Sequence, residues 1–242
     1  MLYISPPFGN YFDYGKQSTK IRGTFTFERR NGLVYHTLRS LRPVKGGWRN
    51  QIGFRNKGLR NIKKFDPHSY YSIAALDNNW IRLFNTVPKN LKIELNVGCP
   101  NVGGYEIKRA DIKTFTKHHK NIIVKVSPYV TREFLDTCQE MGVKTIHLSN
   151  TIPTKRGGIS GAQLKELCIP LVESTAKAYN MDIIAGGGIY SEQDVFDYAN
   201  AGAKHFSIST VLITKPWKVS EIHDAAWKIS KSAWGSPTIG ME

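Results

Sequence analysis

The sequence has few cysteines and no long apolar run. Its three cysteines, Cys99, Cys138 and Cys168, include no CxxC pair, which argues against a disulfide framework and against an iron–sulfur cluster held by this chain. No run of about eighteen apolar residues occurs, so we predict no transmembrane helix. Residues 1–16 lack the basic start and apolar stretch of a secretory signal. We therefore expect a reducing, cytoplasmic setting without membrane association.

Acidic residues are scarce near the start of the chain. The net charge of +15 is concentrated in residues 1–65, which contain 14 Lys or Arg and only 2 Asp or Glu. Such asymmetry favours a nucleic acid, an anionic surface or an acidic partner. A solvated basic face that aids solubility is the alternative, and both interpretations stay open.

The composition itself is that of a folded domain. Of 242 residues, 40% are hydrophobic and 11% aromatic, which excludes intrinsic disorder and leaves ample material for a core. No internal repeat or linker divides the chain, so residues 1–242 are expected to form a single domain.

Short apolar runs rich in Ile and Val alternate with longer amphipathic stretches. This pattern is typical of strands buried on both faces of a parallel sheet. Eight such strands predict a (β/α)8 barrel, an α/β fold, with an open doubly wound sheet as the alternative. About fifteen residues separate the first two strands, which predicts a truncated first βα unit. The eight runs are residues 2–5, 21–27, 70–74, 93–97, 122–126, 145–148, 182–185 and 205–208.

Four helices are expected, over residues 131–141, 161–178 and 218–234 and from Ser191 onward. Ser191 is followed three residues later by Asp194, which is the spacing of a capping box. Cys138 and Cys168 occupy apolar helical positions, which is typical of buried structural thiols.

Cys99 differs from the other two cysteines because it follows a strand, in a loop flanked by Asn96 and Asn101. In a barrel the chemistry lies at the carboxyl ends of the strands. A thiol there can act as a base or nucleophile, and a buried structural thiol is the alternative.

Two further strand ends have the composition of a phosphate site. Gly187 and Gly188 follow one strand, and Ser209 and Thr210 follow the next. Glycines allow close backbone approach to a phosphate, and barrels often bind phosphate with the loops after strands seven and eight. Lys125 lies inside an apolar strand, where it needs a partner. A closed barrel has no edge from which it could snorkel, so a cofactor contact is expected.

Taken together, these segments resemble the dihydroorotate dehydrogenase family. In order they read ELNVGCPNV, IIVKVSP, LSNT followed by GGISG, IIAGGGI and AGAKHFSIST. The resemblance covers most of residues 45–215, and residues 49–58, RNQIGFRNKG, are similar to a further loop of that family.

The resemblance implies FMN-dependent oxidation of dihydroorotate to orotate in pyrimidine biosynthesis, with Cys99 as the base at C5 and flavin N5 accepting hydride from C6. A cysteine at this position is similar to the soluble branch of the family. The residues implied to hold the pyrimidine are Asn50, Asn96, Asn101, Asn150 and Thr151. Asparagine suits an imide edge because its amide both donates and accepts hydrogen bonds.

The same resemblance implies which residues contact FMN. Lys125 and Asn96 lie near the flavin, where a cation favours the reduced form. The phosphate is held by Gly187, Gly188, Ser209 and Thr210, and the neighbouring loop is shaped by Gly158 and Gly161. No metal is expected. A homodimer is usual for the family. The oxidant stays open: fumarate suits a self-contained enzyme, whereas NAD requires a partner subunit that carries FAD and an iron–sulfur centre.

The sequence departs from the family at several positions. Gly23 stands where the family has a lysine that contacts flavin and substrate, with Arg22 and Lys20 nearby. Ser207 and Ser209 replace a glutamine and a glycine. These changes leave open a catalytically impaired flavin-binding protein.

A second flavin family is also similar. The tRNA-dihydrouridine synthases carry N-x-G-C-P, which residues 96–100 match, and a basic region suits an RNA substrate. Asn101, the GGISG segment and the lack of a separate C-terminal helical domain argue against it, so nucleic acid is the less favoured partner. Other FMN-dependent pyrimidine reductases share the chemistry and stay open.

Overall fold

The computed structural model describes residues 1–15, 18–99 and 106–232. Eight parallel strands close into a barrel in the order β1-β12-β11-β8-β7-β6-β5-β2. Because β1 pairs with both β2 and β12, the sheet is closed and the open doubly wound alternative is wrong. The (β/α)8 prediction is confirmed. The barrel strands are β1 (Leu2–Ile4), β2 (Ser18–Phe25), β5 (Tyr70–Ile73), β6 (Lys92–Asn96), β7 (Ile122–Val126), β8 (Thr145–Leu148), β11 (Asp182–Gly186) and β12 (His205–Ile208).

Inside the barrel, apolar and polar side chains are separated along the axis. Tyr3, Ile21, Ile123 and Ile184 form an apolar cluster of their own, distinct from the main core. Closer to the carboxyl ends, polar side chains such as Asn96 are buried instead. Buried polar groups need partners, so this end is where the barrel can build a site.

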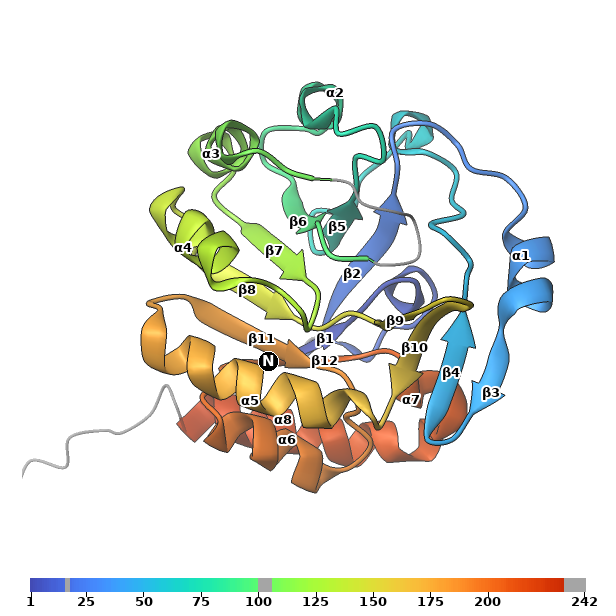
Figure 1. The fold of residues 1–242 in the computed structure, drawn as a ribbon, viewed down its shortest axis with the longest axis vertical. Helices are drawn as coiled ribbons and strands as arrows, with labels where there is room; N and C mark the ends of the chain where they lie inside the picture. Colours follow the sequence, from blue (N-terminus) through green and yellow to red (C-terminus); the bar gives the residue numbers. More distant parts are fainter. Residues whose placement is uncertain (16–17, 100–105, 233–242) are drawn as a thin grey trace, which may run out of the picture.

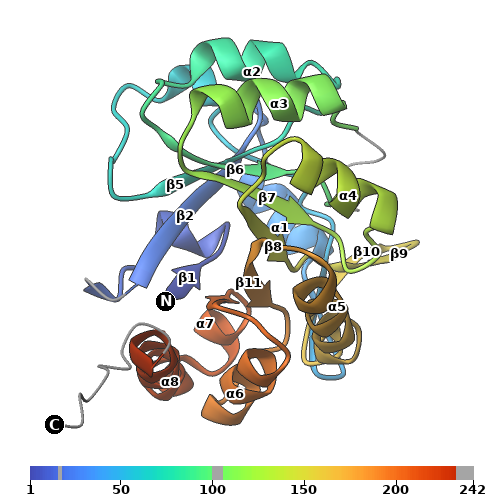
Figure 2. The ribbon, with the colours of Figure 1, turned by 90° about the vertical axis from the view of Figure 1, so that its left-hand side faces the viewer.

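Helices surround most of the barrel, as Figures 1 and 2 show. The expected helices at 131–141, 161–178, from 191 and at 218–234 are confirmed, and Ser191 caps its helix by accepting a hydrogen bond from Asp194 N at 3.3 Å. Cys138 and Cys168 are fully buried on two of them. The helices are α1 (Leu33–Ser40), α2 (Trp80–Thr86), α3 (Arg109–His118), α4 (Arg132–Glu140), α5 (Leu164–Ala178), α6 (Glu192–Asn200), α7 (Val211–Thr214) and α8 (Val219–Ser232), with 3-10 turns η1 (Phe8–Asn10), η3 (Leu59–Asn61) and η5 (Pro216–Lys218).

The first βα unit is reduced, as predicted. Within the described part of residues 5–17, η1 is the sole helical element between β1 and β2. A Cβ built on Gly9 of η1 would lie 2.2 Å from the carbonyl oxygen of Ile21, so glycine lets the turn pack directly on β2. None of the helices in the described ranges has the length and apolar character needed to span a bilayer.

A second, antiparallel sheet lies beside the barrel, at the right of Figure 1. Its order is β3 (Arg42–Val44), β4 (Gly47–Asn50), β10 (Gly157–Gly161) and β9 (Ile152–Thr154). The sequence predicts loops at Asn50, Gly158 and Gly161, and this is wrong because Asn50 ends β4 and both glycines lie in β10. Residues 51–58, the rest of that first predicted loop, contain no named strand or helix. A Cβ on Gly47 would lie 1.9 Å from the carbonyl oxygen of Ser160. The glycines therefore permit this close pairing of β4 and β10. Because glycine has a low β-propensity, the sequence does not predict strands there.

Candidate active site

Two adjoining cavities open at the carboxyl ends of the barrel strands. The larger has a volume of about 390 Å³ and the smaller about 110 Å³. Lys125, Asn150, Thr151, Ser209 and Thr210 line both of them. The two cavities therefore share a wall built from predicted site residues.

The larger cavity brings the predicted asparagines together. Asn50, Asn96, Asn150 and Thr151 all line it. Asn150 Nδ2 donates to Asn96 Oδ1 at 3.3 Å, and Thr151 N donates to Asn150 Oδ1 at 3.0 Å. The Thr151 Oγ1 atom is buried and has no hydrogen-bond partner among the described residues. The amides are thus held in place, and a buried hydroxyl faces a ligand-sized space.

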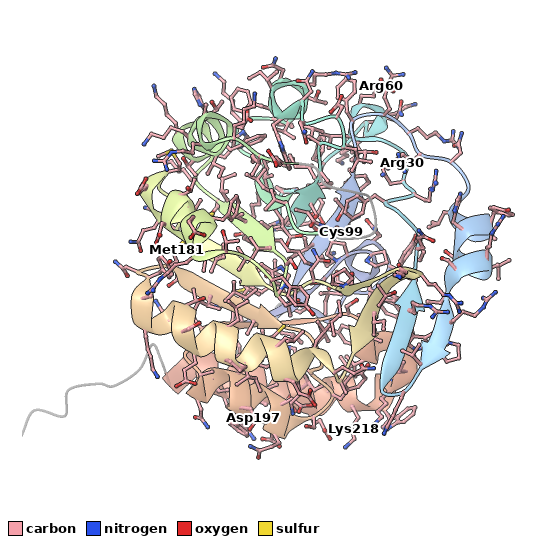
Figure 3. The ribbon with its side chains drawn as sticks, in the orientation of Figure 1. Arg30, Arg60, Cys99, Met181, Asp197 and Lys218 are labelled. Carbon is pink, nitrogen blue, oxygen red and sulfur yellow. The ribbon has the colours of Figure 1, made fainter. Side chains whose placement is uncertain are left out.

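Cys99 lines the same cavity and is half-buried. Figure 3 shows it near the centre of the barrel in this view. A Cβ on the preceding Gly98 would lie 2.2 Å from Ser127 N, so glycine allows the chain to leave β6 close to the end of β7. Asn101 lies outside the described residues. Gly158 pairs with Asn50 across the β4–β10 ladder and lines neither cavity.

The smaller cavity has the features of a phosphate cradle. Gly161, Gly187, Gly188, Ser209 and Thr210 line it. Gly188 has φ +76°, and a Cβ there would lie 2.8 Å from Lys165 Cγ. Within the described ranges, the backbone N–H groups of Gly188, Ser209 and Thr210 donate to no other backbone or side-chain group. Unpaired N–H groups beside a glycine cradle fit the phosphate of FMN.

The glycine loop is anchored from the helix behind it. Tyr198 on α6 donates from its hydroxyl to Gly187 O at 2.6 Å and to Gly186 O at 3.1 Å. Asp194 accepts a hydrogen bond from Tyr190 N at 2.7 Å and forms an ion pair with Lys165. These contacts fix the loop before any ligand binds.

Lys125 is 7% exposed and lies between Asn96 and His147 in strand register. The edge-strand alternative is therefore wrong. Glu94, fully buried on β6, supplies its counter-charge: burial alone would raise the pKa of Glu94, but Lys125 and then the hydrogen bond with His147 lower it below the usual value. Burial and Lys125 also lower the pKa of His147. These lowered pKa values favour the ionised form of Glu94 and the neutral form of His147.

A chain of hydrogen bonds leads from the smaller cavity to Glu94. His147 Nδ1 is 2.7 Å from Glu94 Oε2, His147 Nε2 is 2.9 Å from Ser207 Oγ, and Ser5 Oγ is 2.6 Å from Ser207 Oγ. Because a carboxylate only accepts, the neutral imidazole donates through Nδ1 and accepts from Ser207, which in turn accepts from Ser5. Ser207, which stands in place of the family glutamine, therefore has a defined partner.

Neither basic neighbour replaces the lysine that the family has at the position of Gly23. Arg22 Nη2 lies 3.2 Å from Asp66 Oδ2, and Lys20 Nζ lies 2.5 Å from Asp13 Oδ2. Neither lines the cavities, whereas Gly23 does. Among the described residues the cations that line the larger cavity are Lys125 and Arg55.

A family model described as dihydroorotate dehydrogenase matches residues 8–229. The chain belongs to the dihydroorotate dehydrogenase family. Among its relatives, the catalytic subunit of dihydroorotate dehydrogenase B (NAD(+)) of Bacteroides thetaiotaomicron is 28% identical over 247 residues, covering 84% of this chain and 78% of that one. The corresponding subunit of Thermodesulfovibrio yellowstonii is 29% identical over 239 residues, covering 79% and 78%.

The fold is similar to that of solved members of the dihydroorotate dehydrogenase family. The enzyme of Eimeria tenella in complex with ferulenol matches with a TM-score of 0.67 at 17% identity, covering 96% of this chain and 82% of that one. Membership confirms the predicted resemblance, an oxidoreductase acting on CH–CH bonds, and FMN as the cofactor of the family.

Sequence reasoning missed several lining residues. Thr24 and Ser160 line the larger cavity, and Ser5 lines the smaller one. Thr24 and Ser5 are small polar residues at strand ends, the same signal that identified Ser209. Arg55 carried no such signal, since it lies within a predicted loop.

Proposed function

We propose that this chain oxidises dihydroorotate to orotate with bound FMN, as a step of pyrimidine biosynthesis. The observation that carries the proposal is the shared wall of the two cavities. Asn50, Asn96 and Asn150 line the larger one beside Cys99, and Lys125 joins it to the glycine cradle. A pyrimidine in the larger cavity would therefore be close to an FMN whose phosphate the glycine cradle holds.

Each residue has a stated task. The asparagine amides hold the imide and carboxylate edges of the pyrimidine. Cys99, as the thiolate, takes the proton from C5, and hydride leaves C6 as the C5–C6 double bond forms. FMN, when bound, supplies the hydride acceptor. Lys125 would contact bound FMN and would favour its reduced, negatively charged form, since a preorganised cation acts strongly in a dry site.

The route by which electrons leave is also part of the proposal. The relatives are named as catalytic subunits of an NAD(+)-linked enzyme. In the described part of the chain no group of three or more His, Cys, Asp or Glu is placed to hold a metal. We infer that a partner subunit carries any iron–sulfur centre. The homodimer expected from the sequence stays a prediction.

The direct test is anaerobic reduction of the FMN-loaded chain by dihydroorotate, followed by flavin absorbance. Bleaching supports the proposal. No bleaching, combined with reoxidation of chemically reduced protein by uridine-containing RNA, would instead identify a dihydrouridine synthase-like enzyme. A chain that binds no FMN, even in excess, would be an impaired member of the family.

A further inference from the structure

A third hollow, of about 570 Å³, lies beside the candidate active site and is lined by cations. We call it the arginine hollow. Six arginines line it, together with Lys155 and His36, and none of the described residues in its lining is Asp or Glu. The six are Arg30, Arg39, Arg42, Arg49, Arg55 and Arg156. Five of these belong to the basic stretch of residues 1–65, so much of the charge asymmetry is concentrated at one concave place.

Among the described residues, no acidic side chain neutralises this cluster. The two acidic residues of the basic stretch are engaged elsewhere, Asp13 with Lys20 and Glu28 with Arg60. In the described ranges, none of the hollow's arginines or Lys155 forms an ion pair. Burial, and then the neighbouring charge of Arg55, lower the pKa of Arg30, so part of this shift comes from repulsion between like charges. An anion in the hollow would relieve that repulsion.

The cations come from several elements and surround the space. Arg39 lies on α1, Arg42 on β3, Arg49 on β4, and Arg156 in the turn between β9 and β10. Figure 1 shows these elements side by side at one edge of the molecule. Arg55 Nε is buried and has no hydrogen-bond partner among the described residues. A buried, unpartnered donor in a cationic hollow points to a ligand.

We propose that the arginine hollow binds a small molecule carrying a di- or triphosphate group. Guanidinium forks match phosphate oxygens bidentately, and arginine outnumbers lysine here by six to one. The volume is that of a small-molecule pocket. An extended nucleic-acid face is less favoured, because the six arginines gather around one concave space of small-molecule volume, while Lys20, Arg22 and Arg60 of the basic stretch are paired with carboxylates elsewhere.

The arginine hollow and the candidate active site share two residues, Arg55 and Gly53. Arg30 Nε also donates to Gly53 O at 3.1 Å. Gly53 lies three residues after Asn50, in the loop that follows β4. A phosphate held by Arg30 and Arg55 would therefore bias the position of Asn50. By linkage, binding in the hollow and binding of orotate then alter each other's affinity. This second statement rests on the proposed function, whereas phosphate binding does not.

The test is calorimetric titration of the FMN-loaded protein at low ionic strength with tripolyphosphate, ATP, UTP and orthophosphate. The three triphosphates should bind with one site per chain, and orthophosphate more weakly. Equal affinities would mean that the phosphate chain alone is recognised, and tighter binding of one nucleotide would mean that its nucleoside is recognised too. The double variant R39E/R156E changes two exposed residues, one on α1 and one in the turn between β9 and β10. It should weaken triphosphate binding at least about tenfold.

A matched control reverses two exposed lysines, K113E/K117E, on α3, which in Figure 1 lies on the opposite side of the molecule from α1, β3 and β4. It carries the same charge change and should leave the affinity within about twofold of wild type. Absence of triphosphate binding, or equal losses in the two variants, would overturn the proposal. So would a 5′-hydroxyl single-stranded RNA that binds the wild type more tightly than tripolyphosphate does. These titrations contain no dihydroorotate. Their result therefore tests phosphate binding even if the protein does not oxidise dihydroorotate.

Discussion

The imidazole of His147 lies 2.7 Å from the carboxylate of Glu94, and neither side chain is exposed. Both stand on barrel strands beside Lys125. An ionised carboxylate without partners would be costly at this depth, so the lysine and the imidazole are what make Glu94 tolerable there. The pair connects the barrel interior to the cavity that fits the FMN phosphate.

This relationship predicts an acid-sensitive stability. Because the pKa of His147 is lowered in the folded chain, the unfolded chain binds a proton there first as the pH falls below about 6.5. The contribution of His147 to the free energy of unfolding is therefore present above that pH. It is lost as the pH falls toward the pKa of His147 in the folded chain, by at most about 1.4 kcal/mol per pH unit. The variant His147→Gln should show a flatter dependence of Tm on pH between pH 7 and 5. An unchanged slope would mean that the folded and unfolded chains protonate His147 alike, which would contradict its lowered pKa in the fold.

Replacing Cys99 by Ala should leave FMN bound and slow flavin reduction by dihydroorotate by about 10²- to 10⁴-fold, because a general base is lost. Stopped-flow absorbance under anaerobic conditions measures the step directly. Cys99→Ser is the matched variant: a hydroxyl is a weaker acid than a thiol, so the remaining rate should rise toward higher pH. Unchanged reduction in Cys99→Ala would remove Cys99 from the mechanism.

Gly188→Ala should abolish tight FMN binding. Its φ of +76° disfavours any side chain, and the added Cβ would meet Lys165 Cγ and Ala162 O at 2.8 and 2.9 Å. Gly142→Ala is the control, since its φ of +81° is similar but its nearest contact is Thr116 Oγ1 at 4.0 Å. Both variants should lose about 1–2 kcal/mol of stability from backbone strain. FMN titration by fluorescence should show weaker binding in Gly188→Ala than in Gly142→Ala. Equal affinities of the two variants for FMN would contradict the assignment of the smaller cavity as the phosphate site.

Restoring the family lysine should fail. A Cβ at Gly23 would lie 2.5 Å from Ser72 O, and its φ is +116°. Gly23→Lys should therefore lower Tm and FMN content rather than raise activity. Gly15→Lys adds the same charge at φ +78°, where no atom of the described residues lies within 4 Å of the new Cβ, so the Tm of this variant should fall less. A Gly23→Lys protein as stable as Gly15→Lys, with faster turnover, would refute this expectation.

Much of the barrel could be predicted because its signals are local. Each of the eight apolar runs lies at a barrel strand, since a strand buried on both faces is apolar along most of its length. The Ser191 cap is likewise local, because serine accepts from a backbone N–H three residues away. Cys99 and Gly188 were found for the same reason, as each directly follows a recognisable strand.

The antiparallel sheet could not be predicted in this way. β4 and β10 are polar or glycine-rich, and their pairing joins residues as distant as Trp48 and Ser160, whose hydrogen bond spans 112 positions. Low β-propensity hides such strands when only neighbours in sequence are considered. Asn50 was therefore placed in a loop, although it ends a strand.

The sequence alone determined the barrel, the family resemblance and the excess of positive charge in residues 1–65. Each depends on residue types and short-range spacing. Tertiary structure decided that Glu94, Lys125 and His147 form one buried group, and that Arg55 lies between the arginine hollow and the candidate active site. Charge can be counted in a sequence, whereas concavity and burial arise only when segments distant in the chain pack together.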